Sequence, residues 1–293
     1  MCNTPGSKSV YRVELHFFTN IWRRKVPACR AEWRKMSEFD PNENRVSSGT
    51  VEMSEVATLG SIFFEPERTF KALKAKPRFI LAAIIVSLLV GAYIFALNQK
   101  IGPEGLRREI SAQIEKNPQV ASMSAAEKAQ MVETQMTINS YTQYIMPVFV
   151  VISFLLGALL YWGGSKAFGG EGGFSHALSV WVYSLLPPSL ISVIGSFIVM
   201  YFKAAEEIDI VSSQRGLLQA NLGFLFGKDA SPVLVTLVSV LDLFAIWGWI
   251  LAAIGLRVTN KISSGSAWAV VILVALVGVL FRVIGAFFSG NPS

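Results

Sequence analysis

The sequence predicts an all-α integral membrane protein: a bundle of five transmembrane helices, preceded by a disordered N-terminal tail and a short amphipathic helix. Three observations lead to this fold class. Of the 293 residues 52% are hydrophobic, and the mean hydropathy of +0.48 exceeds that of soluble domains. Five stretches of about 20 residues are almost free of charge, which is the length a helix needs to cross a bilayer. One of these stretches carries two consecutive prolines at its centre.

Residues 1–58 show no sustained helical or strand period and are the predicted disordered tail. Residues 1–35 hold eight Lys/Arg and two Glu, whereas residues 36–67 hold seven acids and one Arg. This change leaves open that the gene start is over-extended and that Met36 or Met53 is the true beginning. Cys2 and Cys29 both lie in the tail and indicate neither a disulfide framework nor a metal site.

Residues 53–76 have the pattern of a short amphipathic segment that leads into the membrane. Pro66 is expected to begin a helix, because proline is favoured in a first turn. The helix carries the basic residues Arg68, Lys71 and Lys74 beside apolar residues such as Phe70. A helix of this kind lies in the headgroup plane of a bilayer; an ordinary soluble connector is the alternative.

The first and second spans, residues 79–97 and 144–162, frame a polar loop. Within the loop, Ser124 and Glu127 fit a capping box, so residues 124–140 are predicted to be helical. Residues 103–116 are predicted to form a second loop helix. The glycine-rich residues 163–173 are predicted to be a short flexible turn, because their order does not fit a phosphate-binding loop.

The third span, residues 174–202, contains Pro187 and Pro188. Proline donates no backbone hydrogen bond, and lipid cannot satisfy the carbonyls that are freed. Tyr183 and Ser184, with Ser189 and Ser192, are the local supply of hydroxyls. The stretch is therefore predicted to be a kinked span enclosed by other spans.

The fourth and fifth spans, residues 232–256 and 266–288, each contain a charge, Asp242 and Arg282. A short turn joins these spans, so they run antiparallel. At ~1.5 Å per residue both charges lie about 21–22 Å from the inner face. Because a charge inside a span is costly, we expect Asp242 and Arg282 to pair. The alternative is that Arg282 reaches outward while Asp242 bonds hydroxyls or is protonated. A short tail, residues 289–293, follows.

The placement of basic residues predicts the orientation. With the N-terminus in the cytoplasm and the C-terminus outside, the inner segments are residues 68–78, 163–174 and 257–265. They hold eight Lys/Arg in 32 residues. The predicted location is the inner (plasma) membrane of a bacterium.

The sequence carries no pattern for catalysis or for nucleic-acid binding. His16 lies in the tail and His176 at the inner edge of the third span, and neither has a second ligand or a carboxylate at helical spacing. The net charge of +6 comes from the tail and from residues 68–78, not from a folded basic surface. We therefore expect a protein that is not an enzyme, binds no nucleic acid and needs no cofactor.

Residues 59–288 resemble the Yip family, the Ypt/Rab-interacting-protein membrane domain, in its bacterial form. The resemblance rests on Leu59-Gly-Ser-Ile-Phe-Phe-Glu-Pro66, on the glycine-rich turn, on Tyr183-Ser-Leu-Leu-Pro187 and on Leu241-Asp-Leu-Phe-Ala-Ile-Trp247. It implies five helices with a cytoplasmic N-terminus. Eukaryotic members bind prenylated small GTPases and carry Asp-Leu-Tyr-Gly-Pro before the first span; this chain lacks that motif, which argues against GTPase binding.

Two functional hypotheses follow. The first is a non-enzymatic membrane scaffold or adaptor that binds a protein partner or itself, with a surface made by the amphipathic helix and the kinked third span. The second is a small permease or channel in which Asp242 and Arg282 line a polar path.

Overall fold

The computed structural model describes residues 53–116, 120–208, 213, 216–218, 220–226 and 230–289. The chain divides into two units, Met1–Thr50 and Val51–Ser293. Most of the predicted disordered tail, and nearly all of the C-terminal tail, lie outside the described residues. Within these ranges the regular elements are helices, and one isolated bridge joins Asn221 to Asp242. The predicted all-α fold class is confirmed.

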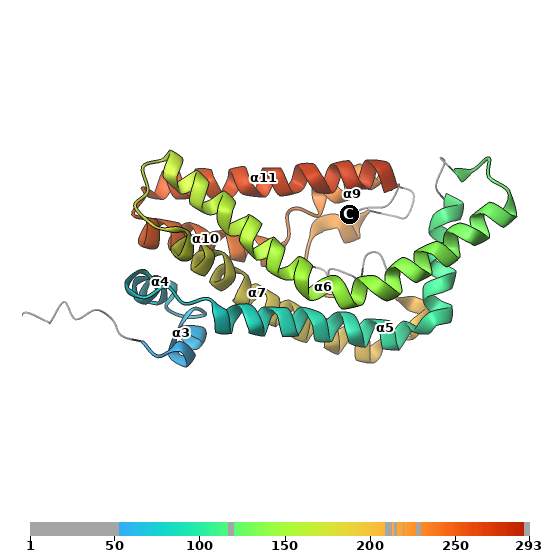
Figure 1. Cartoon of the computed structure of the whole chain (residues 1–293), viewed down its shortest axis with the longest axis horizontal. Coiled ribbons are helices and arrows are strands. Elements are labelled where there is room, and N and C mark those ends of the chain that lie inside the picture. Colours follow the sequence, from blue (N-terminus) through green and yellow to red (C-terminus); the bar gives the residue numbers. More distant parts are fainter. Residues whose placement is uncertain are drawn as a thin grey trace, which may run out of the picture. The chain divides into compact units, whose positions relative to one another are not determined.

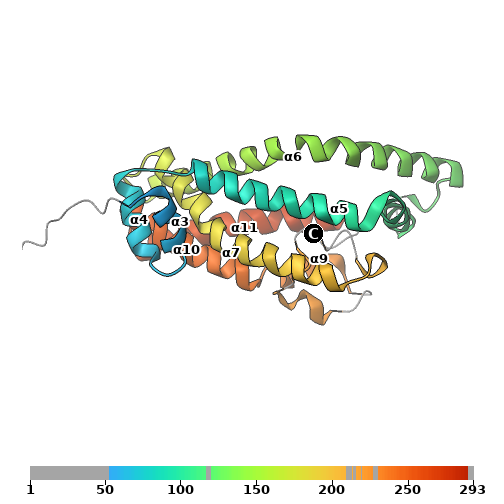
Figure 2. The same ribbon diagram turned by 90° about the horizontal axis from the view of Figure 1, so that it is seen from below.

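Five helices are long and apolar enough to cross a membrane, as the sequence predicts (Figures 1 and 2). They are α5 (Ile80–Lys116), α6 (Ala125–Ala167), α7 (Phe174–Phe202), α10 (Leu243–Asn260) and α11 (Ser264–Ser289). Large apolar side chains remain exposed on their outer surfaces, for example Leu156 on α6 and Leu276 on α11. Water would oppose such a surface, whereas lipid accepts it.

The bundle packs around α7, which contacts α5, α6 and α10 along its length and α4 near its beginning. In its first half Val180, Val182 and Tyr183 are buried to 1% exposure or less. In its second half Ile191 and Ile198 are exposed. The third span is therefore enclosed over its first half and faces the bilayer over part of its second half.

α7 continues as one helix through Pro187 and Pro188, and both prolines are buried. Their missing N–H groups free carbonyls one turn earlier, including that of Ser184. The Ser184 hydroxyl donates to the Trp181 carbonyl, which the prolines do not free, at 2.8 Å. Gly248 of α10 lies against the Ser184 carbonyl, since a Cβ there would be 3.4 Å from that oxygen. Glycine thus lets the α10 backbone approach the freed carbonyl.

The polar segment between the first two spans is a helical hairpin. Gly102, with φ of +69°, interrupts α5, so that the residues after it form the separate helix that the sequence predicts. α6 begins with the complete capping box of Ser124 and Glu127, as expected. Arg107 and Glu133 join the two segments in a 2.6 Å ion pair. Figure 1 shows this hairpin at the end of the bundle away from α4.

The fourth span is not the single helix predicted for residues 232–256. A short helix, α9 (Pro232–Val238), precedes a break, and α10 begins after Asp242. Oδ1 of Asp242 accepts hydrogen bonds from the N–H groups of Phe244 at 2.9 Å and Ala245 at 3.1 Å. A carboxylate that occupies first-turn N–H groups starts a new helix rather than continuing the old one. The prediction failed because it treated Asp242 as a charge inside a helix.

Candidate functional site

Two short helices cover the end of the bundle where α7 begins and α10 ends. They are α3 (Glu55–Ser61) and α4 (Pro66–Ala75), and Pro66 stands in the first turn of α4, as predicted. α4 packs on α10 and α7, and the side chains of Ile62, Phe70 and Leu73 are fully buried. The expectation that this helix lies in the headgroup plane is therefore met only in part, because its apolar face packs in the protein core.

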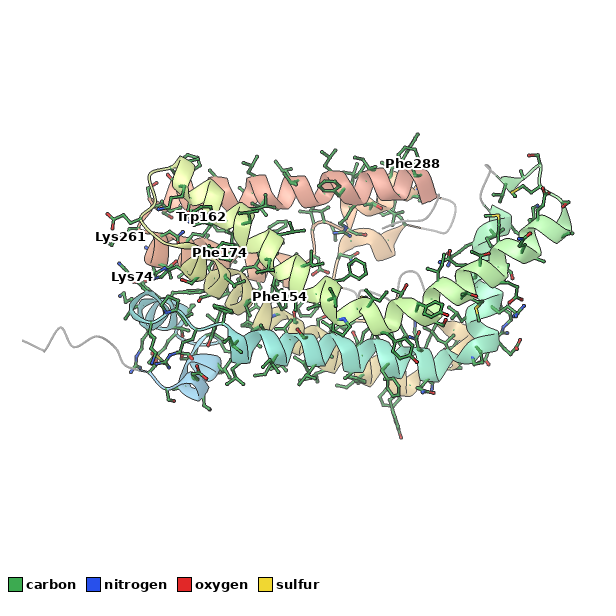
Figure 3. The ribbon with its side chains drawn as sticks, in the orientation of Figure 1. Lys74, Phe154, Trp162, Phe174, Lys261 and Phe288 are labelled. Atoms are coloured by element: carbon green, nitrogen blue, oxygen red, sulfur yellow. The ribbon has the colours of Figure 1, made fainter. Side chains whose placement is uncertain are left out.

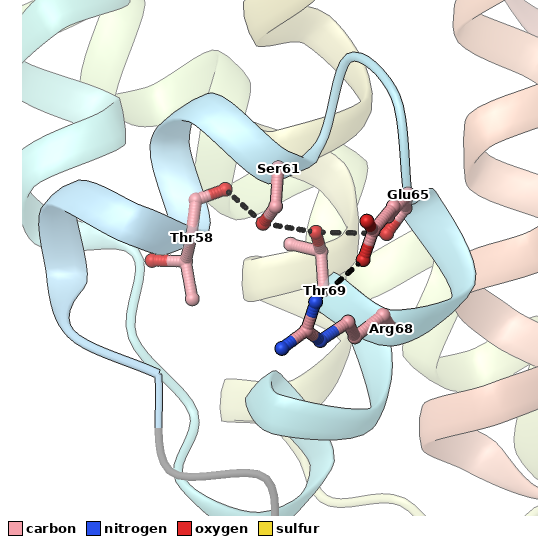
Figure 4. A network of polar contacts seen from close by, with 5 residues as sticks. All are labelled: Thr58, Ser61, Glu65, Arg68 and Thr69. Carbon is pink, nitrogen blue, oxygen red and sulfur yellow. Dashed lines mark hydrogen bonds and ion pairs between the residues drawn. The ribbon is translucent and has the colours of Figure 1, made fainter.

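A polar network fixes the angle between α3 and α4 (Figure 4). The hydroxyls of Ser61 and Thr69 lie 2.6 Å apart, and Thr69 also donates to the Glu65 carbonyl at 3.1 Å. Thr58 donates to the Glu55 carbonyl at 2.6 Å, and its hydroxyl lies 3.0 Å from that of Tyr183 in α7. The hydrogen bonds thus tie the hairpin to itself and to the central span.

Two of the three basic residues predicted for this helix pair with acids. Arg68 pairs with Glu65 at 2.8 Å and Lys71 with Glu67 at 3.0 Å. Glu67 also pairs with Arg257 of α10 at 3.0 Å. The hydrogen bond from Lys71, with the charges of Lys71 and Arg257, holds the pKa of Glu67 below its ordinary value. The surface of α4 is therefore a mixed set of charges, not a basic patch.

Side chains from the three predicted inner segments meet at this end (Figure 3). Nε2 of His176, in the first turn of α7, donates to the Lys74 carbonyl at 3.2 Å, while Nδ1 accepts from the Gly173 N–H at 3.2 Å. Lys261, after α10, forms an ion pair with Glu171. His176 thus has a structural role that joins α4 to α7.

The glycine-rich turn is packed, not the flexible turn that was predicted. Asn260 is fully buried, and its side-chain Nδ2 donates to the Ser165 hydroxyl at 2.6 Å. The backbone carbonyl of Asn260 accepts a hydrogen bond from the Glu171 N–H at 2.9 Å. A Cβ at Gly172 would come within 2.7 Å of the Asn260 amide. Gly172 therefore makes room for Asn260. The only sequence signal for this site was the density of glycines itself.

The most exposed large apolar side chain of this hairpin is Phe64, followed by Val56 at 74%. Phe64, in the turn between α3 and α4, is 89% exposed, although its neighbours Ile62 and Phe63 pack into or against the core. Glu65, Glu67 and Arg68 follow it within four residues of the chain.

A cavity of about 640 Å³ lies farther along the bundle, between α7, the α9–α10 segment and α11. Its charged and polar lining comes from Asp242, Arg282, Asn221, Ser239, Ser189 and Ser192. Its apolar lining includes Tyr161, Trp181, Leu185 and Trp249. The sequence did not predict this cavity, because no local pattern marks a space between distant helices.

The cavity brings together the two charges that the sequence singled out. Asp242 and Arg282 both line it. Asp242 has in addition the capping role that the sequence analysis missed. Their pairing remains a prediction, which this arrangement supports.

The four residues of the predicted kink are divided between core and cavity. Tyr183 and Pro187 lie in the core, at the first half of α7. Ser184 and Pro188 are also buried, but they contribute to the cavity wall. None of them presents a surface outside the bundle, so the kinked stretch supports packing and not an external contact.

This arrangement defines a multi-pass, all-helical integral membrane protein with five spans and a folded helical hairpin at one end. Residues 60–286 match the model of the Yip1 domain, and the chain belongs to this family. The chain is 24% identical over 254 residues to membrane protein YknW of Bacillus subtilis (strain 168). The aligned region covers 85% of this chain and 96% of that protein. No solved structure matches the chain. The resemblance to a bacterial-type Yip protein is confirmed.

Proposed function

We propose that this protein is a non-enzymatic scaffold or adaptor of the membrane, which binds a protein partner through the α3–α4 hairpin. The observation that carries the proposal is the exposure of Phe64 on a hairpin that is otherwise held by buried side chains and hydrogen bonds. A contact surface that is already ordered loses little conformational entropy on binding. The mixed charges of α4 would select the partner.

We place this end of the bundle in the cytoplasm of a bacterium. The contacts of Lys74 with His176, of Glu67 with Arg257 and of Glu171 with Lys261 bring the three Lys/Arg-rich segments to one end. Basic segments of membrane proteins are retained on the cytoplasmic side. With five spans, the end of α11 is then outside. A C-terminal alkaline phosphatase fusion should be active, and an inactive but stable fusion would contradict this orientation.

A permease or channel is not the function we favour. Such a function requires a polar path through the bundle. The wall of the cavity between α7, α10 and α11 is instead largely aromatic and apolar toward α4, with Tyr161, Trp181 and Trp249. Beyond it, Phe70 and Leu256 are fully buried. The described residues therefore support a binding surface better than a path for ions.

Photo-crosslinking in native membranes tests the proposed function. A photoreactive amino acid in place of Phe64 should yield a recurrent protein adduct, identified by mass spectrometry. The matched control replaces Phe287, another strongly exposed phenylalanine (72%) near the end of α11. We expect the control position to give mainly lipid adducts. Lipid adducts alone at both positions would overturn the proposal.

A further inference from the structure

We propose that the cavity between α7, α10 and α11 binds one molecule of a zwitterionic phospholipid, with a phosphoethanolamine head group between Asp242 and Arg282. The inference concerns the end of the bundle away from α4. It stands or falls independently of the proposed scaffold function.

The size and position of the cavity suit a ligand from the bilayer. Its volume of about 640 Å³ lies within the range of small-molecule sites, about 300–1,000 Å³. Gly278, inside the span of α11, lines the cavity. Leu276 and Leu280, on the opposite face of the same helix, are exposed large apolar residues that face lipid. The cavity therefore lies at the depth of the bilayer, where lipid is the most abundant molecule.

The two charged residues of the lining lie at one end of the cavity along the bundle axis, where Phe244 also contributes to the wall. α7 and α11 begin at the α4 end and α10 ends there, as the contacts of His176 and Arg257 show. Trp249 lies seven residues closer to that end than Asp242, and Ala275 seven residues closer than Arg282. Seven residues of helix correspond to about 10 Å. An amphipathic molecule fits this arrangement, with its head at the charges and its acyl chain toward Trp181 and Trp249.

The two charges select the head group. A guanidinium binds phosphate oxygens in a planar, bidentate geometry, which assigns the phosphate to Arg282. A primary ammonium donates hydrogen bonds to a carboxylate, which assigns the amine to Asp242. An anionic head group without an amine would be repelled by Asp242. A choline head group has no N–H to donate.

Native mass spectrometry of the full-length protein, purified in detergent and incubated with defined lipids, measures this binding. Phosphatidylethanolamine should be retained more strongly than phosphatidylglycerol or phosphatidylcholine of the same chain length. Gly278→Leu places a side chain in the cavity, and a Cβ there meets nothing within 4 Å. Retention of phosphatidylethanolamine should fall about tenfold, which corresponds to about 1.4 kcal/mol.

Gly91→Leu is the matched control, because Gly91 is an exposed glycine in the interior of α5 whose Cβ would also meet nothing within 4 Å. It does not line the cavity, and retention should be unchanged. Ala275→Leu fills the cavity from another position and replaces Gly278→Leu if that variant does not fold. Arg282→Gln combined with Asp242→Asn should abolish the preference for phosphatidylethanolamine. Equal retention of the three lipids by the unmodified protein, or full retention by both cavity-filling variants, would overturn the proposal.

Discussion

The two ends of the helical bundle are built from the same five spans, but one end is tightly packed and the other encloses a cavity. At the α4 end, hydrogen bonds join segments that are distant in the chain, such as Asn260 with Ser165 and Thr58 with Tyr183. A Cβ at Gly172 would clash there. The other end also has a hydrogen bond of this kind, from the Tyr93 hydroxyl to the Ser213 carbonyl, but there the fourth span is broken before α10 and a cavity opens.

The polar residues at the α4 end determine how the helices pack. The polar residues at the other end face a cavity that a ligand can occupy. Buried polar groups that are hydrogen-bonded, such as Asn260 and Thr58, hold one arrangement of the helices. Charges that face a cavity are instead costly unless they pair with each other or with a ligand. The α4 end should therefore be the more sensitive to substitution, and the cavity end the more tolerant. Three measurements test this comparison.

The largest loss of stability is expected for Asn260→Ala. This change removes the hydrogen bonds with Ser165 and Thr259, at 2.6 and 2.7 Å, and leaves a void at a fully buried position. We expect the free energy of unfolding to fall by about 2–3 kcal/mol, seen as a lower melting temperature in detergent. Gln130→Ala, at an exposed position of α6, is the matched removal of an amide and should change little. Equal melting temperatures for both variants would remove the distinction between the two ends.

A smaller effect is expected for the charges in the cavity. Asp242→Asn keeps the helix cap, because asparagine caps as well as aspartate, and removes only the charge. Asp242→Asn and Arg282→Gln should each lower the free energy of unfolding by about 1–2 kcal/mol, since both positions are partly exposed. The double variant should lose less than the sum of the two. Strictly additive losses in thermal melting would show that Asp242 and Arg282 do not pair.

The smallest effect concerns the surface ion pairs at the α4 end. The hydrogen bond from Lys71 holds the pKa of Glu67 below its ordinary value of 4.5, and the hydrogen bond from Lys261 does the same for Glu171. A lowered pKa stabilises the fold above pH 4.5 and loses that contribution as the pH falls through the lowered value. The melting temperature should therefore decrease in this acidic window.

The variant Glu67→Gln combined with Glu171→Gln is designed to isolate this contribution. Its melting temperature should depend less on pH in the same window than that of the unmodified protein. Glu104→Gln, at an exposed position of α5, serves as the control and should keep the original pH dependence. A double variant with an unchanged pH profile would assign the acid sensitivity to other groups.

Local features of the chain were predictable because their causes are local. The capping box of Ser124 and Glu127 and the helix start at Pro66 depend on a few consecutive residues, and the structure contains both. Asp242 was misjudged for a related reason. Hydropathy averaged over a window hides one capping residue, so two helices were taken for one.

The sequence by itself determined five spans, the family and the kind of charge in each segment, because length and hydropathy decide whether a helix crosses a bilayer. Tertiary structure alone decided which apolar faces are used in packing. Lipid and a neighbouring helix are equally apolar, so the sequence of α4 does not distinguish a face for the membrane from one for α10. Tertiary structure also decided that Asn260 is buried and that Asp242 and Arg282 face one cavity. These properties arise where helices from distant parts of the chain meet.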